Sequence, residues 1–430
     1  MPRVRVDSWL ARAASAHPDR PAVNDLSYSD LYDCAARAAA TLEDVGKGSR
    51  VAIALAPGTD FAVALHAIWM REAVAVPHDL RLREAERPAA DHLIAESLDC
   101  TGRPFAAAGT HDLGDVAVLL QTSGTTGPGK LVEMTFGNLL WSALGSAAAL
   151  GSHPEERWLS ALPLSHIGGL SVVVRSAIMA TTALVHEGWD TDRVLGALRD
   201  ERVTLVSVVP TTLARLLDAG LREPPQLRCA LVGGGPVAPD LMRHAHAAGV
   251  PVAQTYGLTE TCSQVTTQRP GDDQADAGPP LFCTRVSIAA DGEILVSGPT
   301  VTGLPAPVLA TGDLGTLDKA GRLTVTGRKA DTIVSGGENI APTEIEAVLL
   351  GHPAVAEAAV FGRPDAEWGE AVVARVVLAD GLSASESELI EFCSASLARF
   401  KVPKEVRAVE ALPRTQSGKL RRNALFAGGK

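Results

Sequence analysis

The chain has 430 residues, of which 46% are hydrophobic, and a formal net charge of −11 at pH 7. This length and hydrophobic content predict two or three folded domains and exclude a disordered chain. The acidic balance without a basic stripe argues against a nucleic-acid partner, and the lack of any apolar run of about 18 residues argues against membrane insertion, so we expect a cytoplasmic protein.

Up to about residue 276, apolar runs typical of strands alternate with Ala- and Leu-rich stretches typical of helices. Such alternation predicts βαβ units, and therefore a large α/β N-terminal domain with parallel-rich sheets. The strand-like runs are RVAIAL (50–55), VAVLL (116–120), LVSVVP (205–210) and CALVGGG (229–235), and the helix-like stretches include DLYDCAARAAATLEDVG (30–46) and DRVLGALRDERV (192–203).

From about Ala277 the pattern changes to short strands joined by D-G and A-G turns, which indicates antiparallel hairpins. Pro342 suits the start of a helix, and the remaining signals are enough for a small α+β domain. We place the boundary near Arg328, which gives an N-terminal domain of residues 1–327 and a C-terminal domain of residues 328–430.

The stretch LLQTSGTTGPGKL (119–131) matches the P-loop motif G-x-x-x-x-G-K and then has Leu131 where a hydroxyl must bind Mg²⁺. We interpret it as another kind of phosphate loop, in which small residues admit phosphate oxygens to backbone N–H groups and hydroxyls add donors. A flexible linker is the alternative. The residues concerned are Thr122, Ser123, Gly124, Thr125, Thr126, Gly127, Gly129 and Lys130.

A second polar constellation is VAQTYGLTETCSQ (252–264), which follows an apolar strand signal. Tyr256 offers a flat face for a purine, Thr259 a hydroxyl donor, and Glu260 a carboxylate for Mg²⁺. The alternative is a strand-to-helix loop in which a threonine caps the helix.

Two further segments carry charged candidates. Asp313, expected in a tight turn between glycines, suits the hydroxyls of a ribose, and Arg328 suits the same sugar or its phosphate. The alternatives are a turn-forming aspartate and half of a surface ion pair. In PRTQSGKLRRNAL (413–425), Lys419 follows Ser-Gly, and a solvated lysine loop is the alternative.

Together and in this order, these four segments resemble the adenylate-forming superfamily of acyl-CoA synthetases, adenylation domains and luciferases. The resemblance covers essentially the whole chain. It implies the adenylate-forming enzyme fold, with a small β-barrel-like part in the large domain and a small mobile C-terminal domain. The likeness is strongest to the o-succinylbenzoate–CoA ligases of menaquinone biosynthesis, and it is carried by residues 162–178, 231–267, 312–325 and 335–370.

The resemblance implies a reaction in two steps. A carboxylate attacks the α-phosphate of Mg·ATP to give acyl-AMP and pyrophosphate, and the thiol of CoA then displaces AMP. The first step brings two anions together, so neutralising groups must dominate the site. The implied ligands are thus ATP, Mg²⁺, CoA and a small-molecule carboxylic acid, and a homodimer is compatible with the resemblance.

Roles follow from the resemblance by motif position. Lys419 would bridge the carboxylate and the α-phosphate, Glu260 would bind Mg²⁺, and the C-terminal domain would rotate between the steps about a hinge that here carries Ala330. The other contacts would be Thr122, Ser123, Gly124, Thr125, Thr126, Gly127 and Lys130 with the β- and γ-phosphates, Thr259 with the α-phosphate, Tyr256 and Gly257 with adenine, Gly233, Gly234 and Gly235 between adenine and the acyl group, Asp313 and Arg328 with ribose, and Gly336 and Gly337 with the pantetheine of CoA.

For the acid, His166 matches the position that gates carboxylate entry, and a packed loop histidine is the alternative. o-Succinylbenzoate has a second, spectator carboxylate, whose burial without a donor or cation would cost several kcal/mol. The candidates for that contact are Arg175, Ser263 and Gln264, next to Gly235 in the acyl pocket; for Arg175 an exposed helix arginine is the alternative.

Besides Ala330 at the hinge and a compact region before Leu119, the chain departs from the superfamily in two loops. The loop reads TGPGK where TGxPK is usual, and the stretch LPAPVLA (304–310) is short. Three other functions stay open: another aryl- or acyl-CoA ligase, a free-standing adenylation domain that loads a carrier protein, and a non-catalytic nucleotide-binding regulator.

Overall fold

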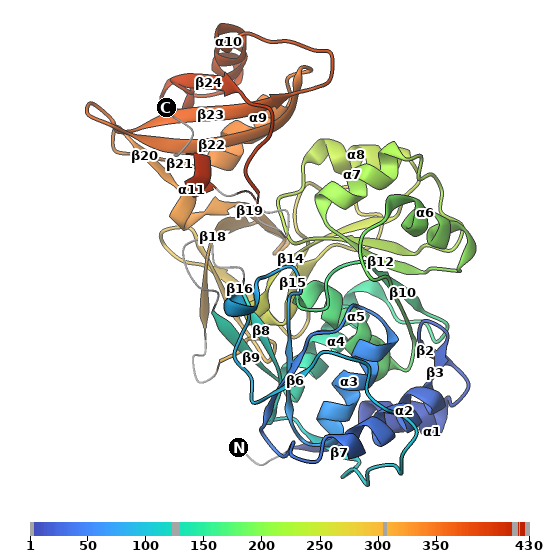
Figure 1. Cartoon of the computed structure of the whole chain (residues 1–430). Helices are drawn as coiled ribbons and strands as arrows, with labels where there is room; N and C mark the ends of the chain where they lie inside the picture. The colour runs from blue at the N-terminus through green and yellow to red at the C-terminus, as the bar shows by residue number, and fades with distance from the viewer. Residues whose placement is uncertain (1–3, 123–129, 304–307, 415–419, 421, 426–430) are drawn as a thin grey trace. The chain divides into compact units, whose positions relative to one another are not determined.

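The computed structural model describes residues 4–122, 130–303, 308–414, 420 and 422–425 (Figure 1). They form two compact units that interleave along the chain. The first is drawn from Met1–Val286, Val296–Leu309 and Lys319–Leu323, and the second from Ser287–Leu295, Ala310–Asp318 and Thr324–Lys430. A single boundary near Arg328 stays a prediction.

The first unit contains an eight-stranded sheet in the order β15–β14–β13–β12–β10–β11–β2–β3. The strands from β14 through β2 pair in parallel, whereas β15 and β3 close the two edges with antiparallel pairing. The bounds are β2 Pro21–Val23, β3 Leu26–Ser27, β10 Arg157–Ser160, β11 Thr182–Val185, β12 Leu205–Val208, β13 Cys229–Val232, β14 Val252–Leu258 and β15 Ser263–Thr267.

A second sheet of the first unit has the order β6–β4–β5–β8–β9, with parallel pairing except between β8 and β9. Strands β1 and β7 form a separate antiparallel pair. Both large sheets confirm the predicted parallel-rich α/β domain. The bounds are β1 Arg5–Asp7, β4 Arg50–Ile53, β5 Val74–Pro77, β6 His92–Ile94, β7 Thr110–Asp112, β8 Val116–Gln121 and β9 Leu131–Thr135.

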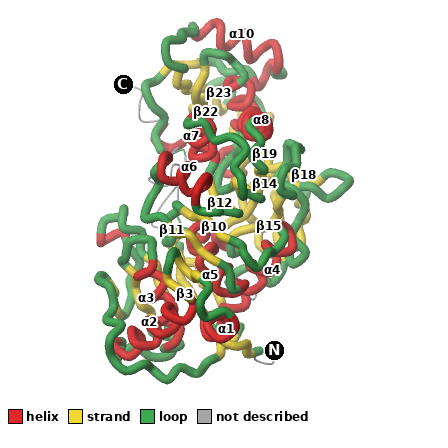
Figure 2. The backbone as a smooth tube through the Cα atoms, turned by 90° about the vertical axis from the view of Figure 1, so that its right-hand side faces the viewer, coloured by secondary structure: helices red, strands yellow, loops and turns green. Residues whose placement is uncertain are grey.

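The helices of the first unit begin where short polar side chains cap them. In α2 the Asp30 amide donates to Ser27 Oγ at 3.1 Å, and in α4 the Asn138 amide donates to Thr135 Oγ1 at 3.1 Å. Figure 2 shows these helices in red against the strands. The bounds are α1 Trp9–Ala16, α2 Tyr28–Thr41, α3 Thr59–Met70, α4 Phe136–Leu150, α5 Ile167–Met179, α6 Thr191–Asp200, α7 Pro210–Asp218 and α8 Pro239–Ala247.

The core of the first unit joins α1, α2 and α3, which lie side by side in both views (Figures 1 and 2), to α5. Tyr28 of α2 is fully buried, and its hydroxyl lies 2.8 Å from the Ser176 carbonyl and 2.7 Å from that of Thr181. These bonds fix the C-terminal end of α5 to α2. In the part of the chain that the structure describes, no helix has the length and apolar character needed to cross a membrane.

The second unit carries most of a four-stranded sheet in the order β16–β17–β18–β19, in the region predicted to be β-barrel-like. It also carries a five-stranded sheet, in which four strands follow the order β21–β20–β23–β22 and the fifth, β24, pairs with β23. The strands predicted on either side of the D-G and A-G turns are the neighbouring pairs β16–β17 and β18–β19, and the pairs β20–β21 and β22–β23 are antiparallel. The bounds are β16 Arg285–Ile288, β17 Glu293–Ser297, β18 Leu309–Leu317, β19 Leu323–Arg328, β20 Ile333–Ser335, β21 Glu338–Ile340, β22 Val355–Asp365, β23 Gly369–Leu378, β24 Glu405–Ala408, α9 Pro342–Leu350, α10 Glu386–Ser396 and α11 Arg422–Leu425.

Candidate active site

The phosphate-loop segment connects two antiparallel strands. Gln121 of β8 pairs with Leu131 of β9, and Thr122 donates from its amide (2.8 Å) and its hydroxyl (3.2 Å) to the Lys130 carbonyl. A P-loop leads from its lysine into a helix, so the strand that follows Lys130 excludes a P-loop. Lys130 is exposed, and Ser123, Gly124, Thr125, Thr126 and Gly127 lie outside the described residues.

Tyr256, Gly257, Thr259 and Glu260 lie in a β-hairpin. Strand β14 leads through a 3₁₀ turn, Thr259–Thr261, into the antiparallel strand β15, so the alternative of a strand-to-helix loop is wrong. The Glu260 carbonyl accepts from the Thr302 amide at 2.8 Å and hydroxyl at 3.1 Å. The backbone of Glu260 is therefore fixed, while the described residues give its half-buried carboxylate no partner.

Two of the glycines predicted for the site, Gly257 and Gly233, leave too little room for a side chain. A Cβ on Gly257 would lie 1.6 Å from the Ser263 carbonyl oxygen, and a Cβ on Gly233 would lie 2.7 Å from Thr255 Cγ2. Gly234 has φ of +78°, which favours glycine. A Cβ on Gly235 would meet open space, so among the three glycines Gly235 leaves room for a ligand beside its backbone.

His166 lies immediately before α5, where its ring meets two charged groups from the loop after β5. Its Nε2 is 3.1 Å from Arg81 Nη2 and 3.4 Å from Asp79 Oδ2. The sequence did not predict either partner, although the charge-rich stretch PHDLRLRE (77–84) directly follows a strand. The ring is about one-third exposed (32%), so it is accessible to a ligand.

Arg175 is buried on α5, with only 4% of its surface exposed, so the alternative of an exposed helix arginine is wrong. Its Nη2 donates to Ser142 Oγ at 3.1 Å, and its guanidinium carbon lies 5.5 Å from the Trp158 ring centroid. Burial lowers the pKa of Arg175 to about 10.

The described residues give Arg175 no carboxylate partner, and its Nε has no hydrogen-bond partner. Ser142 in turn donates to the Cys262 carbonyl at 2.6 Å, which connects α4 to the hairpin that carries Glu260. Arg175 is thus a buried cation with no carboxylate partner in the described part of the chain.

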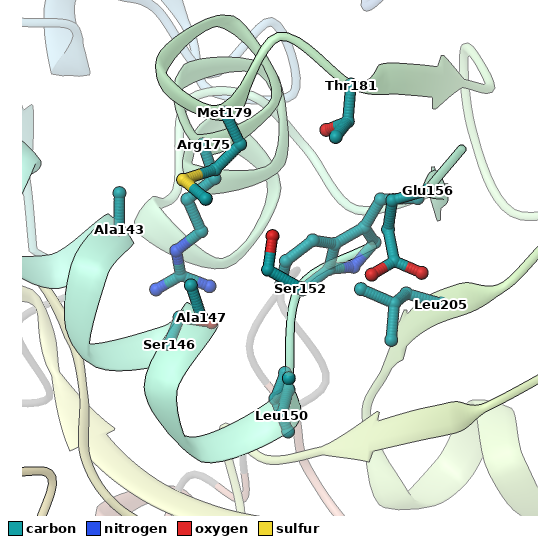
Figure 3. Close-up of a pocket in the computed structure, with 12 residues that line it drawn as sticks. Ala143, Ser146, Ala147, Leu150, Ser152, Glu156, Arg175, Met179, Thr181 and Leu205 are labelled. Carbon is teal, nitrogen blue, oxygen red and sulfur yellow. The ribbon is translucent and has the colours of Figure 1, made fainter. Parts of the chain in front are cut away.

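A pocket with about 350 Å³ of space between its walls, part of it open solvent, lies beside Arg175. Figure 3 shows Arg175 and Met179 projecting from one helix and Ser146 and Ala147 from its neighbour. Glu156 in the same wall is paired with Arg228 at 2.5 Å. The pocket has only Arg175 in common with the predicted site residues; His166 lies nine positions earlier, about 13 Å along the helix.

The other two candidates for the acid lie in β15. Gln264 is 1% exposed, its amide nitrogen donates to Thr267 Oγ1 at 2.8 Å, and its amide oxygen has no partner. One of the two amide N–H donors of Gln264 is therefore used, whereas Ser263, which is half-buried, offers a hydroxyl donor.

In the second unit, Asp313 lies inside strand β18 and not in a turn, so the expectation of a tight turn is wrong. Strand pairing with β17 and β19 overrides the turn signal of the flanking glycines. The carboxylate is 7% exposed, and its Oδ1 lies 2.8 Å from Nε of Arg328, whose side chain is 53% exposed. The structure thus brings these two predicted residues together.

Gly336 and Gly337 form the turn between β20 and β21, with φ of +59° and +85°. A Cβ on Gly336 would lie 3.0 Å from Trp368, an exposed aromatic residue that the sequence analysis did not single out. Lys419 lies outside the described residues. Among the described residues near it, Arg414 and Leu420 form an antiparallel bridge, and Arg422 Nη2 lies 2.6 Å from Glu346 Oε1.

The sequence matches two family profiles in chain order: AMP-binding enzyme over residues 10–97 and 94–303, and AMP-binding enzyme C-terminal domain over residues 344–419. The chain belongs to the AMP-binding enzyme family. This membership confirms the resemblance to adenylate-forming enzymes and the predicted fold class.

Relatives within this family include proteins named 2-succinylbenzoate–CoA ligase. That of Bacillus licheniformis is 38% identical over 97% of this chain and 99% of its own, and that of Bacillus subtilis is 36% identical over 97% of both chains. Among solved structures, o-succinylbenzoate CoA synthetase (MenE) from Bacillus subtilis in complex with the acyl-adenylate intermediate OSB-AMP has a TM-score of 0.91, 35% identity and 98% coverage of both chains.

The same Bacillus subtilis protein in complex with ATP and magnesium ion has a TM-score of 0.90, with coverage of 98% of this chain and all of that one. ATP-bound MatB from Rhodopseudomonas palustris has a TM-score of 0.89 at 26% identity, covering 98% of this chain and 99% of that one. The fold is thus common to proteins with different names.

Proposed function

We propose that this chain is a 2-succinylbenzoate–CoA ligase, which converts the acid, ATP and CoA into 2-succinylbenzoyl-CoA, AMP and pyrophosphate. We choose this acid because Arg175 is a buried cation without a carboxylate partner among the described residues. A buried unpaired charge is costly, and a ligand with a second carboxylate would offset that cost. The names of the relatives support the same acid.

In the first step, a carboxylate oxygen of the acid forms a bond to the α-phosphorus of ATP, and the bond to the pyrophosphate oxygen breaks. We assign neutralisation of the converging charges to Lys419 and to Lys130, Thr122, Ser123, Thr125 and Thr126 of the phosphate loop, with Thr259 at the α-phosphate. Tyr256 and the glycines at 233–235 and 257 would hold the adenine against backbone.

A magnesium ion fits the donor set of this chain when it arrives with ATP. Within the described residues no three His, Cys, Asp or Glu side chains cluster as a metal cage, and the Glu260 carboxylate is unpaired. Mg²⁺ prefers one or two carboxylates together with substrate phosphates and water, so Glu260 alone suffices on the protein side. When bound, the ion would neutralise phosphate charge.

In the second step, the sulfur of CoA forms a bond to the acyl carbon, AMP leaves, and the thiol proton passes to solvent. We assign the approach of the pantetheine arm to Gly336 and Gly337, and the ribose of the nucleotide to Asp313 and Arg328. Because ATP and CoA are drawn from the cytoplasm, we expect the enzyme to act there. A homodimer stays a prediction that light scattering tests.

The test uses purified protein with Mg·ATP and 2-succinylbenzoate, first without and then with CoA. We expect pyrophosphate release and bound acyl-AMP without CoA, and AMP and one thioester per acid molecule with CoA, read by mass spectrometry. Benzoate and a fatty acid are the control acids. Preference for either control by kcat/KM contradicts the proposed acid, and acylation of a carrier protein in place of CoA contradicts the proposed acceptor.

A further inference from the structure

Three charged or titratable side chains meet at the N-terminal end of α5. The His166 ring presents Nε2 to Arg81 Nη2 at 3.1 Å and to Asp79 Oδ2 at 3.4 Å. His166 follows strand β10, whereas Asp79 and Arg81 follow strand β5 of the other sheet. The contact therefore depends on the packing of two sheets within the first unit.

The Asp79–Arg81 pair is closely fitted. Asp79 Oδ1 accepts from the Arg81 amide at 3.1 Å and from its Nε at 2.8 Å, while Oδ2 accepts from Nη2 at 2.6 Å. The Asp79 side chain is 13% exposed. Burial opposes its ionisation, but the hydrogen bonds from the side chain and the amide of Arg81 hold the pKa of Asp79 below its usual value. Asp79 is therefore an anion across the working range of pH.

Arginine can only donate hydrogen bonds, so the nitrogen that faces Arg81 Nη2 must accept. A neutral imidazole has one donor and one acceptor, which leaves Nδ1–H as the donor of the His166 ring. If the ring takes up a proton, Nε2 becomes a donor, Arg81 repels it, and Asp79 Oδ2 is the acceptor within reach.

We propose that Asp79 is a positioning residue for the acid-binding step: it holds Arg81 against Nε2 of His166, and the hydrogen bond from Arg81 orients the ring so that Nδ1–H is available to the carboxylate of the incoming acid. The inference rests on the proposed function only in taking His166 as the residue that the acid meets.

Other charged groups near this loop are directed elsewhere. His78 Nε2 contacts the Pro88 carbonyl at 3.0 Å, and Arg87 donates to the carbonyls of Leu82 and Leu80. Among the described residues, the charged groups that face the His166 ring are thus Asp79 and Arg81.

The test compares Asp79→Asn and Arg81→Met with wild type, using kcat and KM for adenylation of the acid. Asp79→Asn removes the carboxylate that holds Arg81, and Arg81→Met removes the donor to Nε2, so in both variants the His166 ring is no longer held in one orientation. In both variants KM for the acid rises several-fold, more than kcat falls.

Asp115→Asn is the matched control, because Asp115 is paired with Lys47 at 2.7 Å and does not contact His166; we expect the wild-type KM for the acid. Nitrogen-15 NMR of labelled histidine, with the His166 signal assigned through His166→Gln, gives a readout without turnover: we expect the Nδ1–H form in wild type. An Nε2–H form in wild type, or a KM for the acid that is unchanged in both variants, overturns the inference. Absence of turnover of 2-succinylbenzoate by wild type contradicts the proposed function alone, because the NMR arm is unaffected.

Discussion

The backbone of Gly257 in β14 lies so close to that of Ser263 in β15 that a Cβ on Gly257 would be 1.6 Å from the Ser263 carbonyl oxygen. Cys262 and Ser263 adopt φ of +53° and +95°, so this end of the hairpin is already under backbone strain. The close approach fixes the turn that presents Thr259 and Glu260.

Gly257→Ala should therefore open the hairpin. We expect a loss of about 3 kcal/mol or more in the free energy of unfolding, because backbone must move, and loss of ATP binding by calorimetry. Gly196→Ala is the control, since a Cβ at this helical position meets open space and should be neutral or stabilising. Retention of wild-type Tm and ATP affinity in Gly257→Ala would contradict this account.

Arg175→Met should separate acid recognition from folding. Without the cation, we expect kcat/KM for 2-succinylbenzoate to fall about 100-fold, equivalent to about 3 kcal/mol, while a monoacid analogue that lacks the spectator carboxylate is little affected. Tm should be unchanged or higher, because a buried unpaired charge is removed. An equal loss of kcat/KM for both acids, or a large drop in Tm, would show that Arg175 stabilises the folded protein and does not recognise the acid.

Asp313→Asn should weaken nucleotide binding through the ribose. Hydrogen bonds to a charged acceptor contribute about 1.5–3 kcal/mol, so KM for ATP should rise roughly tenfold or more. The variant should also lose the wild-type preference for ATP over 3′-deoxy-ATP. Asp291→Asn, which removes an exposed pairing with Lys329 in the same unit, is the control. If Asp313→Asn keeps the preference for ATP over 3′-deoxy-ATP, Asp313 does not bind the ribose.

Two buried histidines should make the first unit sensitive to acid. His66 is 3% exposed beside Trp69, and His111 is 7% exposed and stacked on Phe136 with ring centroids 4.3 Å apart. Burial lowers the pKa of His66 to about 3, with a smaller effect from His111, and burial lowers that of His111 to about 4.

In the unfolded chain both histidines take up a proton near the ordinary histidine pKa of 6.5, whereas in the folded chain they stay neutral until pH 3–4. The free energy of unfolding therefore falls as the pH drops below 6.5, and this decline ends near pH 3–4. At pH 5 each histidine should cost about 2 kcal/mol relative to neutral pH. Chemical unfolding at pH 7 and pH 5 measures the difference. His66→Leu and His111→Leu should each reduce it, and an unchanged difference in both variants would exclude this cause.

Several features of the site were predictable because they are local. The phosphate-loop segment, the hairpin residues around Tyr256 and the segment around Asp313 are recognisable from residue types at fixed spacing. Their order along the chain identified the family before any contact was known. The strand and helix signals of the first unit were equally local, since periodicity of apolar residues reports which side of an element is buried.

Other features depend on residues that are distant in sequence. Asp79 and Arg81 precede His166 by more than eighty positions, and no spacing rule connects them. The burial of Arg175 could not be predicted from VVVRSA, because an arginine within an apolar stretch suits either an exposed face or an ion site. Only the packing of α5 against α4 and Trp158 decided between them.

The sequence by itself thus determined the family, the two-step chemistry that the family implies, and the identity of most candidate ligand contacts. The tertiary structure decided that Asp313 lies within a strand, that Lys130 leads into a strand, and which charges meet His166. The physical reason is that motif chemistry resides in residue types, whereas burial, ion pairing and the protonation of a ring depend on which distant strands and helices pack together.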